Sequence, residues 1–417
     1  MKRILFITQE LYPSTAANER ILFRVIDQLL AYPDISISIL GQAQPEARWT
    51  DNYKGCPIIH TPWKHVAQYK EWNLRLTRMK WLRFLLYPRS IAYRIARAKG
   101  FENPYVWEAQ RWLKKHCEEY DAIVAMSMPY ENLDIAAYVG DKVPVIFYPL
   151  EPIATYDKHV ADFEQKLEYE IELENKATKL ILTHLIHQDF LSERTKVNDG
   201  KVVEAEFPCV IQRLSQHGQT TENREKINIV FVGRFYIGTR EPDFLCHLID
   251  SLPTDRYQLT IVGGFSRNNY KPEFVKKYLS NHHPTIKNVG FVGPEEADRY
   301  LINADILVHI GNRMPNIMPS KILDYISSGK PILNICKIHE CPTIPLMKHY
   351  PMGLTIFEEE GISELVSERV REFCEKNKGK EISFEQIREM YWEYTPEEVG
   401  KIFYETIQAA IKEFKHK

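Results

Sequence analysis

The sequence predicts an α/β chain of two consecutive doubly wound domains with parallel sheets. Its 417 residues exceed what one hydrophobic core usually organises. A strand–helix–strand pattern opens the chain, and a second series of the same kind begins near Ile227. Short apolar strands that alternate with helices are typical of parallel sheets covered on both faces. Ligands of such domains bind beyond the carboxyl ends of the strands.

The first domain is predicted to span residues 1–205. Its strands are expected at 4–7, 35–39, 122–125, 145–148 and 180–183, with helices at 21–30 and 162–176. A polar stretch, 206–226, is read as the linker. The second domain, 227–395, has expected strands at 227–232, 258–262, 288–292, 306–310 and 331–335, and a helix at 241–252. An amphipathic helix at 396–417 is expected to pack back on the first domain.

Composition excludes several classes of protein. The net charge of −2 gives no reason to expect nucleic acid as a partner. Seven scattered cysteines without a Cys-x-x-Cys pair favour free thiols in a reducing compartment rather than a zinc site. The apolar run after Lys2-Arg3 is too short for a signal peptide, and there is no 18-residue apolar stretch. We therefore expect a cytoplasmic protein, either free or peripheral on the cytoplasmic face of the inner membrane.

The most informative segment runs from Ala304 to Leu333. A strand is followed by a loop and by a helix predicted to open at Pro319, because proline suits a first helical turn. The amides of that turn, with Ser320 and Lys321, are suited to a diphosphate. Asp324 lies one turn further, where its carboxylate can accept hydrogen bonds from ribose hydroxyls.

This segment resembles the donor-binding motif of family-4-like glycosyltransferases of the GT-B fold, in which two glutamates with seven residues between them precede a Gly-x-Pro. Aligned on Gly329 and Pro331, Asp324 takes the second glutamate position and Asn316 the first. The resemblance implies that Asp324 binds ribose and that Asn316 faces the sugar or its phosphate. The uncharged Asn316 departs from the family pattern at the position that reads the sugar.

Other residues extend the resemblance through the second domain. Gly233-Arg234 follows a strand, and Arg240 precedes the next helix. In this family, cations at similar places neutralise the diphosphate of the sugar donor. Gly263-Gly264 and the loop with Gly293 and Pro294 resemble loops whose backbone holds the nucleobase and phosphate. His309, at a strand end near this loop, is a further candidate for donor binding or for a base, although a structural role is favoured.

The first domain carries the predicted acceptor side. Ser127 lies in a loop that resembles the family's serine-proline loop, and Glu151 stands where relatives carry an Asp-Pro; it is a candidate contact for acceptor or sugar. Ser14 and Thr15 are expected to line the acceptor side. Among the other histidines, 159, 184 and 187 could each serve as a base, but no catalytic triad or metal arrangement is recognisable.

The segment Lys64–Lys99 is strongly basic and rich in aromatic residues. Such segments bind anionic membrane surfaces, here bringing the protein to a lipid-linked acceptor, but a basic helical pair with solvated charges is the alternative.

The resemblance implies a nucleotide-sugar-dependent hexosyltransferase, with UDP favoured over GDP, that acts on a glycan or lipid-linked hydroxyl in cell-surface polysaccharide synthesis. It also implies retention of configuration and no obligatory metal or other cofactor, because Arg234, Arg240, Lys321 and helix amides stabilise the leaving diphosphate. The alternatives are a nucleotide-sugar epimerase and a non-catalytic relative that binds a glycan or a partner transferase.

Overall fold

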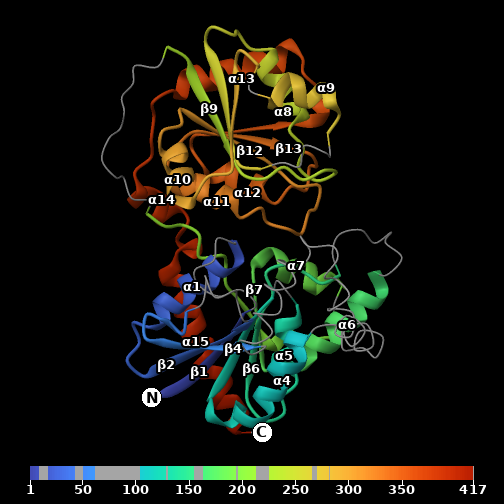
Figure 1. Cartoon of the computed structure of the whole chain (residues 1–417), viewed down its shortest axis with the longest axis vertical. Helices are drawn as coiled ribbons and strands as arrows, with labels where there is room; N and C mark the ends of the chain where they lie inside the picture. Colours follow the sequence, from blue (N-terminus) through green and yellow to red (C-terminus); the bar gives the residue numbers. More distant parts are fainter. Residues whose placement is uncertain are drawn as a thin grey trace, which may run out of the picture. The chain divides into compact units, whose positions relative to one another are not determined.

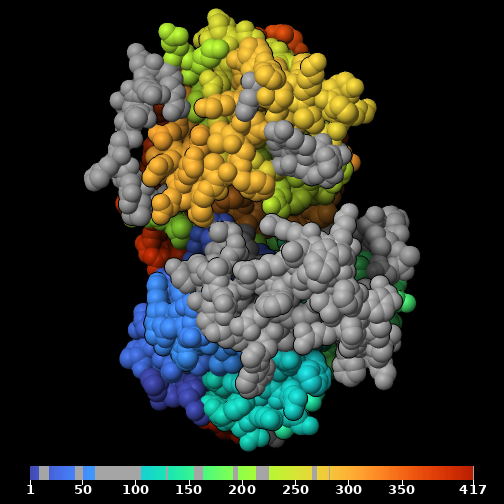
Figure 2. Space-filling view, viewed as in Figure 1, coloured from blue at the N-terminus to red at the C-terminus, as the bar shows by residue number. Residues whose placement is uncertain are grey.

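The computed structural model describes residues 1–8, 17–42, 50–61, 104–127, 130–154, 163–193, 196–212, 225–264, 270–280 and 282–416, and Figure 2 draws the others in grey. Ser14, Thr15, His159 and the segment Lys64–Lys99 lie outside the described residues. The chain divides into two compact units, one formed by Met1–Pro208 with Pro396–Lys417 and the other by Cys209–Thr395.

The first unit is built on an eight-stranded sheet in the order β3-β4-β2-β1-β5-β6-β7-β8, in which only the β3–β4 pair is antiparallel. Its elements are β1 (Lys2–Thr8), α1 (Ala17–Leu29), β2 (Ile35–Gln42), β3 (Asn52–Tyr53), β4 (Cys56–Thr61), α4 (Pro104–His116), β5 (Ala122–Met126), α5 (Glu131–Ala137), β6 (Val145–Tyr148), α6 (Phe163–Asn175), β7 (Lys179–Leu182), α7 (His184–Glu193), β8 (Val202–Glu204) and α15 (Pro396–Lys415).

Helices cover both faces of this sheet, as expected for its fully apolar central strands (Figure 1). Helices α4, α5, α6 and α7 bury apolar side chains in one core cluster. The C-terminal helix α15 packs on α1 and on β5, β6 and β7. At the α1–α15 contact, a Cβ on Gly400 would lie 2.3 Å from Cβ of Gln28, so only glycine allows this approach.

The second unit has a six-stranded parallel sheet in the order β11-β10-β9-β12-β13-β14. Its elements are β9 (Ile227–Val232), α8 (Asp243–Asp250), β10 (Tyr257–Val262), α9 (Pro272–Phe274), β11 (Ile286–Gly290), α10 (Pro294–Ile302), β12 (Ile306–Ile310), α11 (Lys321–Ser327), β13 (Ile332–Cys336), α12 (Thr343–His349), β14 (Gly353–Phe357), α13 (Glu364–Asn377) and α14 (Phe384–Met390). Helices α8 and α13 share one core cluster with one face of the sheet.

The strand order reverses direction between β9 and β12, which makes the carboxyl ends of these strands the topological switch point of the second sheet. Loops that follow β9, β10, β11 and β12 therefore meet at one edge. The predicted donor residues all lie in these loops, at the ends of the strands, at the start of α10 or on α11.

Among the boundaries that differ from the sequence prediction, three matter here. Strand β11 spans 286–290 rather than 288–292, because Gly290 adopts a φ of 82° and leaves the extended region. The unit boundary falls at Pro208–Cys209, within the predicted linker 206–226. Residues 206–208 of that linker belong to the first unit, and Cys209 and Val210 belong to the second, where Val210 N–H donates to Tyr394 O at 2.9 Å. The third difference, at α11, concerns the site itself.

Candidate functional site

Three glycine-containing loops stack backbone to backbone at the carboxyl ends of β9, β10 and β11. Gly233 N–H donates to Val262 O at 2.9 Å, and Gly263 N–H donates to Gly290 O at 2.8 Å. Gly263 has a φ of 134°, and a Cβ there would lie 1.7 Å from Gly233 O. Residue 263 must therefore be glycine both for its conformation and for the close approach of two chains. The predicted glycines 233, 263 and 264 are brought together here.

Gly293 and Pro294 form the start of α10 beside these loops. Gly293 is the N-cap residue in extended conformation, and Pro294 occupies the first helical turn. A Cβ on Gly293 would meet nothing within 4 Å, so its backbone is open to the approach of a ligand.

Arg240 is a partly buried cation. A tight loop holds it, because Tyr236 and Arg240 exchange two backbone hydrogen bonds of 2.7 Å. Its Nη2 donates to Asn312 Oδ1 at 2.9 Å, while its Nε has no hydrogen-bond partner among the described residues. Desolvation lowers the pKa of Arg240. Within the described part of the chain it has no carboxylate partner, so an anionic ligand would satisfy both its charge and its unused donor.

Lys321 and Asp324 form an ion pair on the first turn of α11. The Nζ–Oδ2 distance is 2.8 Å, and 29% of the lysine side chain and 9% of the aspartate side chain are exposed. In this arrangement the predicted phosphate-binding cation and the predicted ribose-binding carboxylate neutralise each other. Both remain at the carboxyl end of β12, where they were expected.

Helix α11 begins at Lys321 rather than at Pro319, which corrects the predicted helix start. Ile322 N–H donates to Pro319 O at 3.0 Å and Leu323 N–H donates to Ser320 O at 3.1 Å. These are bonds between residues three apart, so the chain enters the helix through a tighter turn. Ser320 is the N-cap residue, but its side chain makes no capping hydrogen bond. Asn316 lies partly buried in the loop before this turn.

His309 is buried beneath the same loops, with 2% of its surface exposed. Its Nδ1 lies 2.9 Å from Asn334 Oδ1, and its ring packs edge-on against Tyr325. Burial and the nearby Arg240 lower the pKa of His309 to about 3. The imidazole is therefore neutral near pH 7 and too weak a base for the catalytic alternative. Its Nε2 has no hydrogen-bond partner among the described residues, so it remains a hydrogen-bond acceptor near Arg240.

In the first unit, the loop after β6 carries Glu151. Tyr130 Oη donates to Glu151 O at 2.9 Å, and Leu150 N–H donates to Ser127 Oγ at 2.7 Å. Ser127 is fully buried, so its hydroxyl positions this loop rather than facing an acceptor as the sequence suggested. Burial raises the pKa of Glu151, a property common in functional carboxylates.

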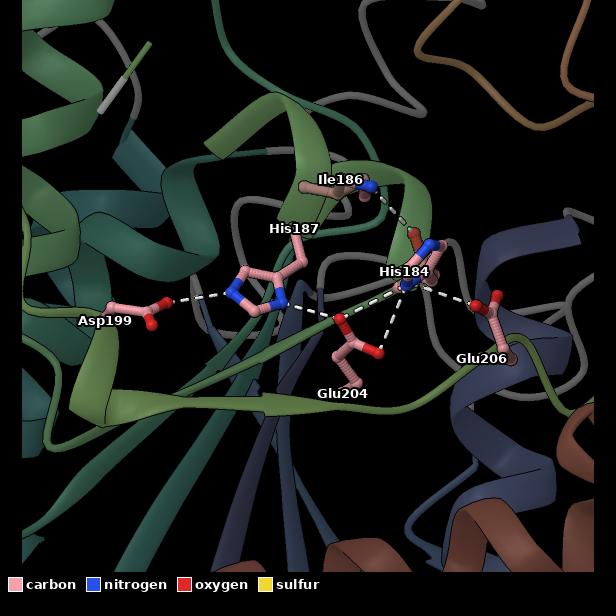
Figure 3. A network of polar contacts seen from close by, with 7 residues as sticks. His184, Ile186, His187, Asp199, Glu204 and Glu206 are labelled. Carbon is pink, nitrogen blue, oxygen red and sulfur yellow. Dashed lines mark hydrogen bonds and ion pairs between the residues drawn. The ribbon is translucent and has the colours of Figure 1, made fainter. Parts of the chain in front are cut away.

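The candidate bases His184 and His187 are held by carboxylates around the start of α7 (Figure 3). His187 lies between Glu204 and Asp199, with Nδ1 2.6 Å and Nε2 2.8 Å from their oxygens. Burial lowers the pKa of His187, but hydrogen bonds to Asp199 and Glu204 outweigh it, and the pKa is raised. Because two carboxylates hold both of its ring nitrogens, we assign His187 a structural role rather than the role of a catalytic base.

Two residues of the site were not singled out from the sequence. Asn312 receives the Arg240 hydrogen bond, and its place two residues after β12 was the available signal. Tyr325 fastens α11 to β9, because its hydroxyl donates to Val232 O at 3.0 Å and accepts from Val232 N–H at 2.8 Å. The sequence does not reveal such a contact between residues 93 positions apart.

No group of three or more His, Cys, Asp or Glu side chains suited to a metal ion occurs among the described residues. In the same part of the chain, no helix is long and apolar enough to cross a membrane.

Two Rossmann-like α/β units, with cations and glycine loops at the switch point of the second, define the GT-B class of protein. Residues 226–343 match the family model described as glycosyl transferases group 1. That segment contains Gly233, both candidate arginines, Lys321 and Asp324. The second unit thus resembles the group 1 glycosyltransferases in the region that forms the candidate site.

Solved structures have the same fold over nearly the whole chain. HepE from Anabaena, in complex with UDP and glucose, is 13% identical with a TM-score of 0.63, covering 98% of this chain and 100% of its own. Sucrose-phosphate synthase from Thermosynechococcus elongatus is 13% identical with a TM-score of 0.60, covering 99% and 95%. WaaG, a glycosyltransferase involved in lipopolysaccharide biosynthesis, is 14% identical with a TM-score of 0.57, covering 99% and 100%. The comparison with curated proteins finds no match.

Proposed function

We propose that this protein transfers a hexosyl unit from a nucleoside-diphosphate sugar, UDP rather than GDP, to a hydroxyl group of a glycan or lipid-linked acceptor in cell-surface polysaccharide synthesis. The observation that carries the proposal is the partly buried Arg240, whose shielded Nε has no hydrogen-bond partner among the described residues, at the switch point of the unit that matches the group 1 glycosyltransferases. UDP is preferred because the similar HepE structure contains UDP and glucose.

In this proposal the site residues stabilise the leaving group, which is the nucleoside diphosphate. Arg240 and Lys321 would face the diphosphate, where fixed cations withdrawn from water stabilise developing charge. Asp324 would then exchange its contact with Lys321 for the ribose hydroxyls. Retention of configuration follows if the acceptor attacks from the side of the departing phosphate, which then takes the acceptor's proton. Glu151, with its raised pKa, is the candidate contact for the acceptor hydroxyl.

We expect no requirement for a divalent metal, because Arg234, Arg240 and Lys321 supply the positive charge. Transfer activity should therefore be unchanged by an excess of EDTA. Restoration of activity only on addition of Mg²⁺ or Mn²⁺ would contradict this part of the proposal. The acceptor would be reached at a membrane through the basic segment Lys64–Lys99, so transfer to a lipid-linked acceptor should increase with vesicles containing anionic lipid.

The first experiment is calorimetric titration of the full chain with UDP, GDP and ADP. We expect UDP to bind more tightly than GDP, and ADP weakest. Absence of binding of all three at millimolar concentration would rule out the transferase. Binding without transfer from UDP-hexoses to a broad acceptor set would favour the non-catalytic alternative, for which the uncharged Asn316 is the specific observation. Release of an epimerised sugar nucleotide would favour the epimerase.

A further inference from the structure

Phe291 follows β11 and has 69% of its surface exposed, the largest fraction of any aromatic side chain in the described part of the chain. Single exposed apolar residues are common, so exposure alone carries no meaning. The position of Phe291 in the loop is informative, because β11 ends at the same edge of the sheet as β9 and β10. An aromatic ring therefore stands in the open beside the glycine loops and the candidate arginines.

The position of the Phe291 ring depends on two residues from other strands. A Cβ on Gly264, just after β10, would lie 1.9 Å from two of the ring carbons. The ring thus occupies space that any other residue at 264 would fill. The Arg234 guanidinium, just after β9, lies over the ring, 5.2 Å from its centroid. Three strand ends converge to hold one flat face beneath a cation.

The contact of Arg234 with the Phe291 ring can be replaced by a stronger contact with a ligand. Arg234 is exposed, and a cation–π contact at an exposed site is weaker than charge-assisted hydrogen bonds to a phosphate. A diphosphate at the switch point would draw Arg234 away from the ring. The uncovered face of the Phe291 ring would then be open to the same ligand. The one flat apolar surface of a nucleoside diphosphate is its base.

We propose that Phe291 stacks on the base of the bound nucleoside diphosphate, and that Arg234 covers the ring until the diphosphate draws it away. This inference rests on the proposed function and adds a binding residue to it. Stacking accepts any base because every base has a π-face, so Phe291 contributes affinity for a nucleotide over a bare diphosphate without choosing between UDP and GDP.

The test compares UDP with inorganic pyrophosphate by calorimetric titration of the full chain. Phe291→Ala should weaken UDP binding by at least about fivefold, the lower end for loss of one stacked base. It should leave pyrophosphate binding unchanged or tighter, because Arg234 is released. Phe291→Trp keeps a flat face and should retain UDP binding. The matched control is Trp392→Ala, since Arg388 lies over the Trp392 ring, 4.5 Å from its centroid, in a segment that carries none of the candidate site residues; it should change neither affinity.

Two outcomes would overturn the inference while leaving the proposed function intact. In one, Phe291→Ala binds UDP as tightly as the wild type. In the other, UDP and pyrophosphate weaken equally, which means that the ring only supports the loop. Failure of the proposed function is distinct, because the wild-type chain would then bind none of the nucleotides.

Discussion

The ammonium group of Lys321 lies 2.8 Å from the carboxylate of Asp324, its neighbour one helical turn away. Each residue was expected to bind a different part of a nucleotide, yet in this structure they bind each other. The ion pair compensates the negative charge of a largely buried carboxylate. Binding would exchange this contact for two new ones, to phosphate and to ribose.

Replacement of Asp324 by Ala should weaken UDP binding by about tenfold or more, because a carboxylate that accepts hydrogen bonds is lost. Calorimetry measures the change. The matched control is Glu381→Ala, which breaks the Lys330–Glu381 ion pair, also 2.8 Å long, in the same unit. Equal affinities of Asp324→Ala and the wild type would mean that the ribose site lies elsewhere.

Arg240→Met should lower UDP affinity by about tenfold or more while the thermal midpoint stays unchanged or rises. A withdrawn cation without a carboxylate partner is costly, and an apolar chain of similar length removes that cost. Asn312→Ala should instead destabilise the fold by about 1–3 kcal/mol, because Arg240 then loses its hydrogen-bond acceptor. Thermal unfolding and titration of the two variants separate these effects. A lower midpoint with full UDP affinity in Arg240→Met would assign Arg240 to the fold alone.

Gly263→Ala should destabilise the second unit far more than Gly238→Ala. Both glycines have positive φ, but only at residue 263 would a Cβ collide with backbone, while at residue 238 it would meet nothing within 4 Å. We expect about 1 kcal/mol for Gly238→Ala from strain alone, and at least about 3 kcal/mol for Gly263→Ala. Urea unfolding of the variants checks this order. Similar midpoints would show that the two loops separate easily.

The His187 network should make the stability of the first unit depend on pH. The folded pKa of His187 is raised, so its contribution is complete below the unfolded value of about 6.5 and is lost as pH rises through the folded value. The pKa of Glu204 is lowered, since hydrogen bonds to His187 and His184 outweigh its desolvation, and its contribution is lost as pH falls through that lowered value. Because the carboxylates are exposed, the change should stay below about 1 kcal/mol.

Thermal midpoints between pH 5.5 and 9 measure this dependence. The wild type should lose stability across the upper part of that range, and His187→Gln should flatten the curve. His116→Gln is the control, as His116 pairs with one exposed carboxylate outside the network. A curve of His187→Gln parallel to that of the wild type would contradict the assignment.

The sequence could predict the fold because its strands are continuous apolar runs that can only be buried between helices. Strands 227–232 and 306–310 were predicted at their observed limits. Strands β8 (Val202–Glu204) and β14 (Gly353–Phe357) were not predicted, because neither contains a continuous buried apolar run. The family resemblance, not local spacing, assigned Lys321, Asp324 and the glycines to one candidate site.

The segment from Asn316 to Pro331 shows where such reasoning ends. Its order of loop, helix and strand and the diphosphate binding proposed for it follow from residue types at short spacing, which the sequence alone supplies. The Arg240–Asn312 hydrogen bond and the contact of Arg234 with the Phe291 ring were decided only by the tertiary structure. Each joins residues that follow separate strands, so each forms only when the sheet brings those strand ends together. The Lys321–Asp324 pair joins residues three positions apart on one helix, and the fold decided only how far it is buried.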